Sequence, residues 1–141
     1  MSLKERLKAD LERDEGRIPH VYQDSEGYWT IGVGHLVDKR KGGRLPDTII
    51  DSLLEYDIEE TIAKCRQSFP WFDSLDEGRQ AVVCNMVFNL GLKGFMGFRR
   101  AIEAIEKRDW EAASIEMLDS RWARQVGSRA VRLARIMKTG E

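Results

Sequence analysis

One apolar stripe between Asp47 and Gln67 constrains this chain more than any other feature. Its members recur at the helical period and would bury one face of a helix: Ile49, Ile50, Leu53, Leu54, Ile58, Ile62 and Cys65. At 1.5 Å per residue, such a helix is about 30 Å long. The sequence therefore predicts one long helix over residues 47–67, with Asp47 as its N-cap.

Most of the remaining chain also carries a helical pattern. Residues 3–13 form an amphipathic stretch, and Gly16 is placed to end it in a left-handed cap. Residues 81–90 are apolar almost all round, which predicts a helix buried at the centre of a helical lobe. Three further amphipathic segments follow, at about 98–107, 109–119 and 128–138.

Only residues 20–36 carry a strand pattern. Two short runs of β-type residues flank the turn-forming segment 24–27, which predicts a small hairpin or a three-stranded meander. We therefore expect an α+β fold in a single domain, residues 1–141. Its expected parts are a small lobe at about 14–46, a linking helix at about 47–67, and a helical lobe at about 70–138 that includes the N-terminal helix 3–13.

Composition excludes several classes of protein. The 141 residues hold 23 Lys and Arg against 24 Asp and Glu, so the net charge of −1 does not indicate a globally basic nucleic-acid binder. Cys65 and Cys84 stand outside any CxxC pair, which favours two buried thiols over a disulfide framework. No apolar stretch approaches the ~18 residues of a membrane span, and the first residues show no signal peptide.

Candidate chemistry is concentrated in residues 14–35. Glu15 is followed after nine positions by Asp24 and after six more by Thr30. Hydrolysis of a glycosidic bond needs two carboxylates of this kind, one a neutral acid and one a charged base, and a hydroxyl near the base can hold a water molecule. The spacing alone still favours ordinary acids of a solvated turn, because one third of the chain is charged.

A longer set of motifs favours catalytic carboxylates over ordinary acids of a turn. Glu15-Gly16 and the run from Tyr22 to His35 resemble the bacteriophage T4-type lysozymes, the endolysins of glycoside hydrolase family 24. The family pattern is Glu, eight residues, Asp, five residues, Thr, then Ile-Gly-x-Gly-His, and every element occurs here at the family spacing. The likeness covers most of the chain and continues through residues 73–76, 85–89, 110–113, 120–122 and 129–130.

The resemblance implies a role for each matching residue. Glu15 resembles the general acid, Asp24 the residue that positions or deprotonates the attacking water, and Thr30 the hydroxyl that holds this water. Three further matches are supporting positions: Arg129, which faces the acid, Asp14 as the ion-pair partner of Arg129, and His35 as a structural histidine. Three others line the substrate cleft: Leu36, Phe88 and Asn89. The family inverts stereochemistry, so we expect the two carboxyl groups to lie ~6.5–9.5 Å apart.

The resemblance also implies an activity. We expect a muramidase that hydrolyses the β-1,4 bond between N-acetylmuramic acid and N-acetylglucosamine in bacterial peptidoglycan, acting as a monomer during host cell lysis. It needs no metal and no other cofactor, because the carboxylates supply the acid and the base. With no export signal, it would stay in the host cytoplasm until released to the cell wall. Residues 37–46 are shorter than in well-known members, and the usual aromatic tail is missing after Gly140.

Three alternatives stay open at this point. A lytic transglycosylase cleaves the same bond with the substrate's own hydroxyl, although the pair Asp24 and Thr30 favours hydrolysis. A catalytically dead wall-binding relative would not need the intact set of Glu15, Asp24 and Thr30. A nucleic-acid-binding helical protein would use residues 121–138, which contain six Lys and Arg and no acid.

Overall fold

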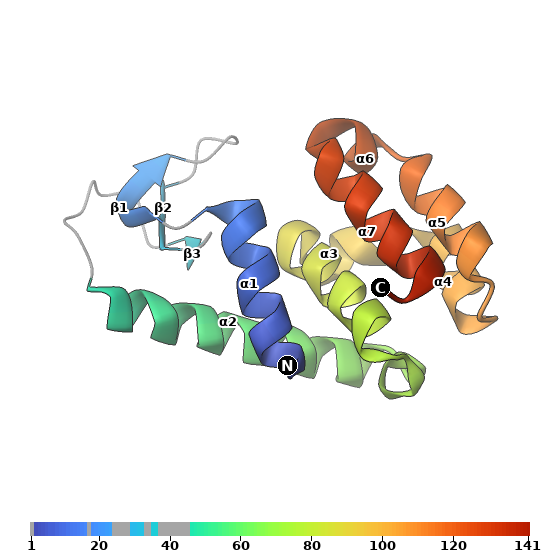
Figure 1. Cartoon of the computed structure of the whole chain (residues 1–141), viewed down its shortest axis with the longest axis horizontal. Coiled ribbons are helices and arrows are strands. Elements are labelled where there is room, and N and C mark those ends of the chain that lie inside the picture. Colours follow the sequence, from blue (N-terminus) through green and yellow to red (C-terminus); the bar gives the residue numbers. More distant parts are fainter. Residues whose placement is uncertain (1, 17, 24–28, 33–34, 37–45) are drawn as a thin grey trace. The chain divides into compact units, whose positions relative to one another are not determined.

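The computed structural model describes residues 2–16 and 46–141 with their side chains, and the backbone alone of residues 18–23, 29–32 and 35–36. The chain divides into two compact units, Met1–Thr61 and Ile62–Glu141, and the boundary falls inside one helix. Each unit is therefore described by itself. Figure 1 shows the elements of both units along the chain.

The first unit contains two helices joined by ion pairs. Helix α1 (Leu3–Glu15) begins at Ser2, whose hydroxyl accepts a hydrogen bond from the Glu5 amide, and ends at Gly16, whose φ is 77°. Lys4 pairs with Glu59 and Lys8 with Asp51, so two ion pairs connect α1 to helix α2 (Asp47–Ser68). The apolar side chains of this part of the core are buried: Leu7, Leu11, Ile50, Leu54 and Ile58.

Helix α2 confirms the long helix predicted from the apolar stripe, and it continues one residue further, to Ser68. The predicted N-cap is wrong. Asp47 is the first helical residue, and the amides of Ile49 and Ile50 donate to the carbonyl of Pro46 instead. An acidic residue in the first turn is still stabilising there, because the amino end of a helix carries a partial positive charge.

The backbone of the strand-type segment forms three short antiparallel strands. They are β1 (Ile18–Gln23), β2 (Trp29–Gly32) and β3 (His35–Leu36), in the order β1-β2-β3. Thr30 is paired with Tyr22 on one side and with Leu36 on the other. The register shifts between Ile18 and Tyr22, so the first strand carries an irregularity of the β-bulge type.

The second unit is built around helix α3 (Glu77–Met96). Asp76 caps it, and a positive φ at Gly91 kinks it, because glycine tolerates this conformation without strain. A single 3-10 turn, Phe72–Ser74, precedes it. The helices that follow are α4 (Arg99–Glu106), α5 (Trp110–Leu118), α6 (Arg121–Val126) and α7 (Ser128–Thr139). Helix α7 packs against α3, α5 and α6.

The core of this unit confirms the predicted buried helix for residues 81–87, whereas Phe88 and Leu90 are half-buried and Asn89 is exposed. Every residue from 81 to 87 is buried, which agrees with a segment that is apolar almost all round. Aromatic rings extend this core in an unbroken series. Phe69 contacts both Trp71 and Phe95, Phe95 contacts Phe98, and Phe98 meets Trp122 edge-on at 5.9 Å between ring centroids. Such pairs add stability beyond the apolar area that they bury.

The carboxyl end of α7 is fixed to the start of α3. Gly78 lies so close to Gly140 that a Cβ at this position would meet the Gly140 carbonyl oxygen at 2.0 Å. The guanidinium of Arg79 donates to the carbonyls of Met137 and Lys138 at 2.7 and 2.9 Å, and lies 4.0 Å above the ring of Trp110. The end of the chain is therefore held by hydrogen bonds that run from one helix to another.

The structure corrects the predicted α+β class. The described chain is predominantly helical: α2 and α3 alone span 22 and 20 residues, whereas the three strands have six, four and two. The strands contribute few of the described residues, so the class of the fold is decided by its helices. The strands share one compact unit with α1 and most of α2, and do not form a separate β-hairpin lobe. The predicted lobe boundaries stay a prediction.

Candidate functional site

Glu15 is the last residue of α1, and its side chain is half-buried. The next residue, Gly16, has a positive φ and donates its amide to the carbonyl of Glu12 at 3.1 Å, which ends the helix. Asp14, the predicted partner of Arg129, is also half-buried on the same helical turn. The sequence therefore folds locally so that a partly shielded carboxyl group stands at the point where the helix ends and the strands begin.

The other two predicted catalytic residues are described less fully. Asp24 lies outside the described residues, one position after the end of β1 at Gln23. Thr30 is on β2, and its side chain lies outside the described set, as do those of His35 and Leu36 on β3. The backbone register does bring Thr30 and Leu36 together as direct partners across the β2–β3 pair. The predicted gap between the carboxyl groups of Glu15 and Asp24 stays a prediction.

Two predicted substrate contacts lie at the end of the regular part of α3. Phe88 is half-buried and Asn89 is exposed, directly before the kink at Gly91. The Asn89 Oδ1 atom accepts a hydrogen bond of 2.8 Å from the indole Nε1 of Trp122, which is itself buried. This bond fixes the Asn89 side chain and satisfies the buried N–H group of Trp122.

Arg129 is a buried cation on α7. Its Nε and Nη2 atoms both donate to the Asn85 Oδ1 atom, at 3.1 and 2.8 Å, and the Asn85 side chain is fully buried on α3. Asn85 is a structural residue that was not predicted from the sequence. The signal was present as the one polar residue that interrupts the apolar run from Ala81 to Phe88. The predicted approach of Arg129 to Glu15 stays a prediction, because the two residues belong to different units.

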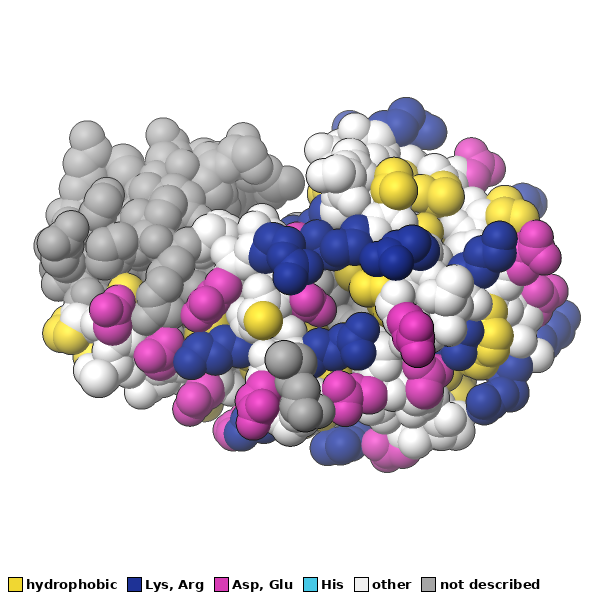
Figure 2. All heavy atoms as spheres, viewed as in Figure 1, with side chains coloured by type: hydrophobic (Ala, Val, Ile, Leu, Met, Phe, Trp, Pro, Cys, Tyr) yellow, Lys and Arg dark blue, Asp and Glu magenta, His cyan; other side chains and the backbone are white. Residues whose placement is uncertain are grey.

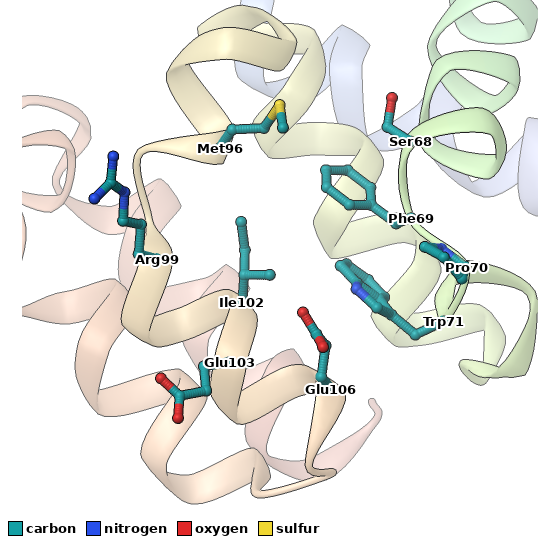
Figure 3. Close-up of a pocket in the computed structure, with 9 residues that line it drawn as sticks. All are labelled: Ser68, Phe69, Pro70, Trp71, Met96, Arg99, Ile102, Glu103 and Glu106. Carbon is teal, nitrogen blue, oxygen red and sulfur yellow. The ribbon is translucent and has the colours of Figure 1, made fainter.

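Among the described residues of the second unit, an open groove of about 690 Å³ lies between the segment 68–71 and helix α4. Figure 3 shows the rings of Phe69 and Trp71 on one side, facing Ile102 on the other, with Glu106 below and Arg99 at the far end. None of the predicted site residues lines it. A second depression of about 430 Å³ is bounded by Trp122, which links it to the position of Asn89.

Cys65 and Cys84 are free, fully buried thiols, as predicted, and their sulfur atoms lie 4.0 Å apart. The hydrogen bond to Cys65 and the burial of the group raise the pKa of the Cys84 thiol far above its ordinary value. Because the thiolate is the reactive form, Cys84 is an inert core residue.

The described residues contain neither a metal-binding cluster nor a membrane-spanning helix. No group of three or more His, Cys, Asp or Glu side chains is arranged to hold a metal ion there. In the same part of the chain, no single helix has the length and apolar composition of a membrane span. Helices α3 and α4 reach that composition only when taken together, across a bend of 102°.

Comparison with known proteins decides the family. The sequence model of the phage lysozymes matches residues 12–136, which is most of the chain. The chain belongs to the phage lysozyme family. It is a lysozyme-type hydrolase of the cell wall, and therefore a glycosidase whose substrate is peptidoglycan.

Individual relatives agree with this assignment. The chain is 30% identical to probable T4-type lysozyme 2 of Dictyostelium discoideum, an alignment that covers 95% of this chain and 94% of the relative. It is also 30% identical to the pre-baseplate central spike protein Gp5 of Enterobacteria phage T4, over 99% of this chain but only 28% of the spike protein. An endolysin of Salmonella phage P22 is 24% identical over 74% of this chain. The resemblance to T4-type lysozymes that the motifs indicated is thus confirmed.

Proposed function

We propose that this lysozyme hydrolyses the β-1,4 bond between N-acetylmuramic acid and N-acetylglucosamine, with inversion at the anomeric carbon. The observation that supports this best is the extent of the family match, which begins at residue 12 and so includes Glu15, Asp24 and Thr30 at the spacing of the T4-type pattern. An inverting mechanism needs one carboxylic acid and one carboxylate with room for a water molecule between them.

Glu15 is the proposed general acid. Its half-buried position at the end of α1 shields the carboxyl group from part of the solvent while leaving a face open to substrate. In the reaction it donates its proton to the glycosidic oxygen as the bond to the anomeric carbon breaks. This proton transfer makes the sugar a better leaving group, and general-acid catalysis of this kind contributes about a hundredfold or more.

Asp24 and Thr30 are the proposed water-binding pair. The carboxylate of Asp24 takes a proton from the water as the water oxygen attacks the anomeric carbon, and the Thr30 hydroxyl holds that water from another side. The position of Thr30 on β2, six residues after Asp24 and paired with Tyr22 near the end of β1, supports this pairing. A reaction of this kind proceeds with residues of this chain alone and calls for no cofactor.

The remaining residues have binding and supporting roles in this proposal. Leu36, Phe88 and Asn89 contact the glycan, and Asn89 is held for this purpose by the indole of Trp122. Arg129 and Asp14 support Glu15, and His35 is structural. The biological role proposed is lysis of a bacterial host, since relatives from two phages are named endolysins. The enzyme would stay in the host cytoplasm until it is released to the wall, and would act as a monomer.

The experiment is digestion of purified peptidoglycan by the wild-type protein and by Glu15→Gln, followed by mass analysis of the glycan fragments. Hydrolysis predicts fragments with free reducing ends from the wild type and almost none from the variant. Fragments with an internal anhydro ring would instead identify a lytic transglycosylase. Wall binding with no cleavage by the wild-type protein would identify a catalytically dead relative.

A further inference from the structure

The charges of the chain are divided unevenly between the two units. Residues 1–61 contain 9 Lys and Arg against 14 Asp and Glu, whereas residues 62–141 contain 14 against 10. The net charge of −1 for the whole chain therefore conceals an acidic first unit and a basic second unit. Uneven charge of this kind directs association with charged partners even when the total is near zero.

Six of the 14 Lys and Arg residues of the second unit lie in residues 120–140. The segment from Ser120 to Gly140 contains no Asp or Glu. Five of its cations define what we name the basic ridge: Arg121 and Arg124 on α6, and Arg132, Arg135 and Lys138 on α7. All are exposed except Arg132, which is half-buried. Figure 2 shows dark blue Lys and Arg side chains gathered over α7 on the face in view.

Helix α7 separates its residues by type. Leu133, Ala134, Ile136 and Met137 are buried, whereas Arg135 and Lys138 project from the opposite side with Val131, which is 61% exposed. Residues 132, 135 and 138 are spaced by three, so they lie near one face and span about 9 Å along the helix axis. The α7 part of the ridge is thus a line of cations with no acidic residue on the same helix. At the α6 end, Arg121 borders a depression that Glu116 and Asp119 also line.

The backbone beneath the ridge is fixed. Arg79 donates to the carbonyls of Met137 and Lys138, and α7 packs on α3, α5 and α6. Because this backbone is already ordered, binding has to order only the side chains of the ridge, and a ligand that carries charge at regular intervals contacts several of them at once. A polymer with repeating phosphates meets this description better than a single small anion does.

We propose that the basic ridge binds a phosphodiester polymer of the bacterial envelope and so retains the enzyme at the wall. This inference rests on the proposed function, because the substrate of a wall hydrolase lies among such polymers. Single-stranded nucleic acid is disfavoured, because α7 presents no aromatic ring on which bases would stack. Duplex DNA shares the phosphate chemistry, and it is separated from the proposed ligand by the experiment.

The test measures binding of fluorescently labelled poly(glycerol phosphate) between 50 and 200 mM NaCl. The ridge variant is Arg135→Gln with Lys138→Gln, and the matched control is Lys64→Gln with Lys93→Gln, which removes two exposed cations elsewhere in the same unit. We expect the ridge variant to bind about tenfold more weakly. The slope of log affinity against log salt concentration should fall by about 1.4–1.8, because each cation removed accounts for about 0.7–0.9. The control keeps the wild-type slope.

Two results would overturn the inference: equal losses in the ridge variant and in the control, or tighter binding of a duplex DNA of equal length than of poly(glycerol phosphate). Thermal unfolding of both variants checks that each is folded. The Glu15→Gln protein should bind the polymer as tightly as the wild type, so its loss of lysis does not bear on the ridge. A wild-type protein that binds the polymer but leaves peptidoglycan intact would contradict the proposed function alone.

Discussion

Helix α3 and the segment from Glu15 to Leu36 represent two different uses of a similar length of chain. In α3, every residue from 81 to 87 is buried, and its polar member, Asn85, bonds the buried guanidinium of Arg129. In the segment 15–36, short strands alternate with turn-forming residues, and the register is irregular. The difference indicates that stability depends on α3 and its neighbours, whereas the proposed chemistry depends on residues at helix and strand ends.

The largest effect is expected at Glu15. Glu15→Gln should lower the rate of wall clearing by about a hundredfold or more, because an amide has no acid proton to donate. Its thermal unfolding should match that of the wild type, since the substitution keeps the shape of the side chain. Turbidity clearing of permeabilised Gram-negative cells measures the rate. The control is Glu5→Gln on the same helix, which should clear cells at the wild-type rate.

In the helical core, we expect a substitution to lower stability. Leu133→Ala on α7 removes a side chain that is 1% exposed, and it should lower the free energy of unfolding by about 2–5 kcal/mol. Val131→Ala, on the same helix but 61% exposed, should change it by no more than about 0.5 kcal/mol. Urea unfolding measures both. Similar losses for the two variants would contradict the packing described for α7.

A smaller loss is expected where the core contains a buried cation. Asn85→Ala removes the acceptor of two hydrogen bonds from Arg129, and it should lower the free energy of unfolding by about 2 kcal/mol, because the guanidinium stays buried. Asn89→Ala removes one bond, from Trp122, at an exposed position, and should lower it by about 1 kcal/mol. If Asn89→Ala proved the more destabilising of the two in urea, the structural role given to Asn85 would be wrong.

The smallest effect is expected at a fully exposed ion pair. The hydrogen bond and charge of Lys107, at 2.8 Å, lower the pKa of Glu103 below its ordinary value. A lowered carboxyl pKa contributes stability above the pKa of the unfolded chain, and this is lost as the pH falls through the folded value. Lys107→Gln should return the pKa of Glu103 towards normal in a carboxyl NMR titration, with little change in stability, because solvent screens the pair.

Long helices with a regular apolar pattern were predicted from the sequence, whereas short elements were predicted less well. Helices α2 and α7 were predicted within one residue at each end, because each buries one face of a regular apolar pattern. Helix α3 was predicted only over residues 81–90, whereas it spans Glu77–Met96, because its ends lack the all-round apolar pattern of its middle. Helix α6 was not predicted as a helix, since its six residues are too short to show a period. The predicted α+β class was wrong because it gave too much weight to residues 20–36. They are rich in β-type side chains, but they form only three short strands.

The candidate site divides in the same way. Motif spacing placed Glu15 at a helix end and Thr30 on a strand, and both positions are observed. The bonds of Arg129 to Asn85 and of Trp122 to Asn89 were not predicted, because each joins residues more than thirty positions apart. A pattern read along the chain reports which face of a helix is buried, but not which side chain on another helix meets it.

The anomer released first from a β-linked glycan tests the central claim most directly. If Asp24 and Thr30 hold the attacking water while Glu15 donates its proton, proton NMR of a fresh digest should show the α-anomer before mutarotation mixes the two forms. A β-anomer as the first product would mean direct attack by a carboxylate and a covalent intermediate, and it would contradict the roles proposed for Asp24 and Thr30.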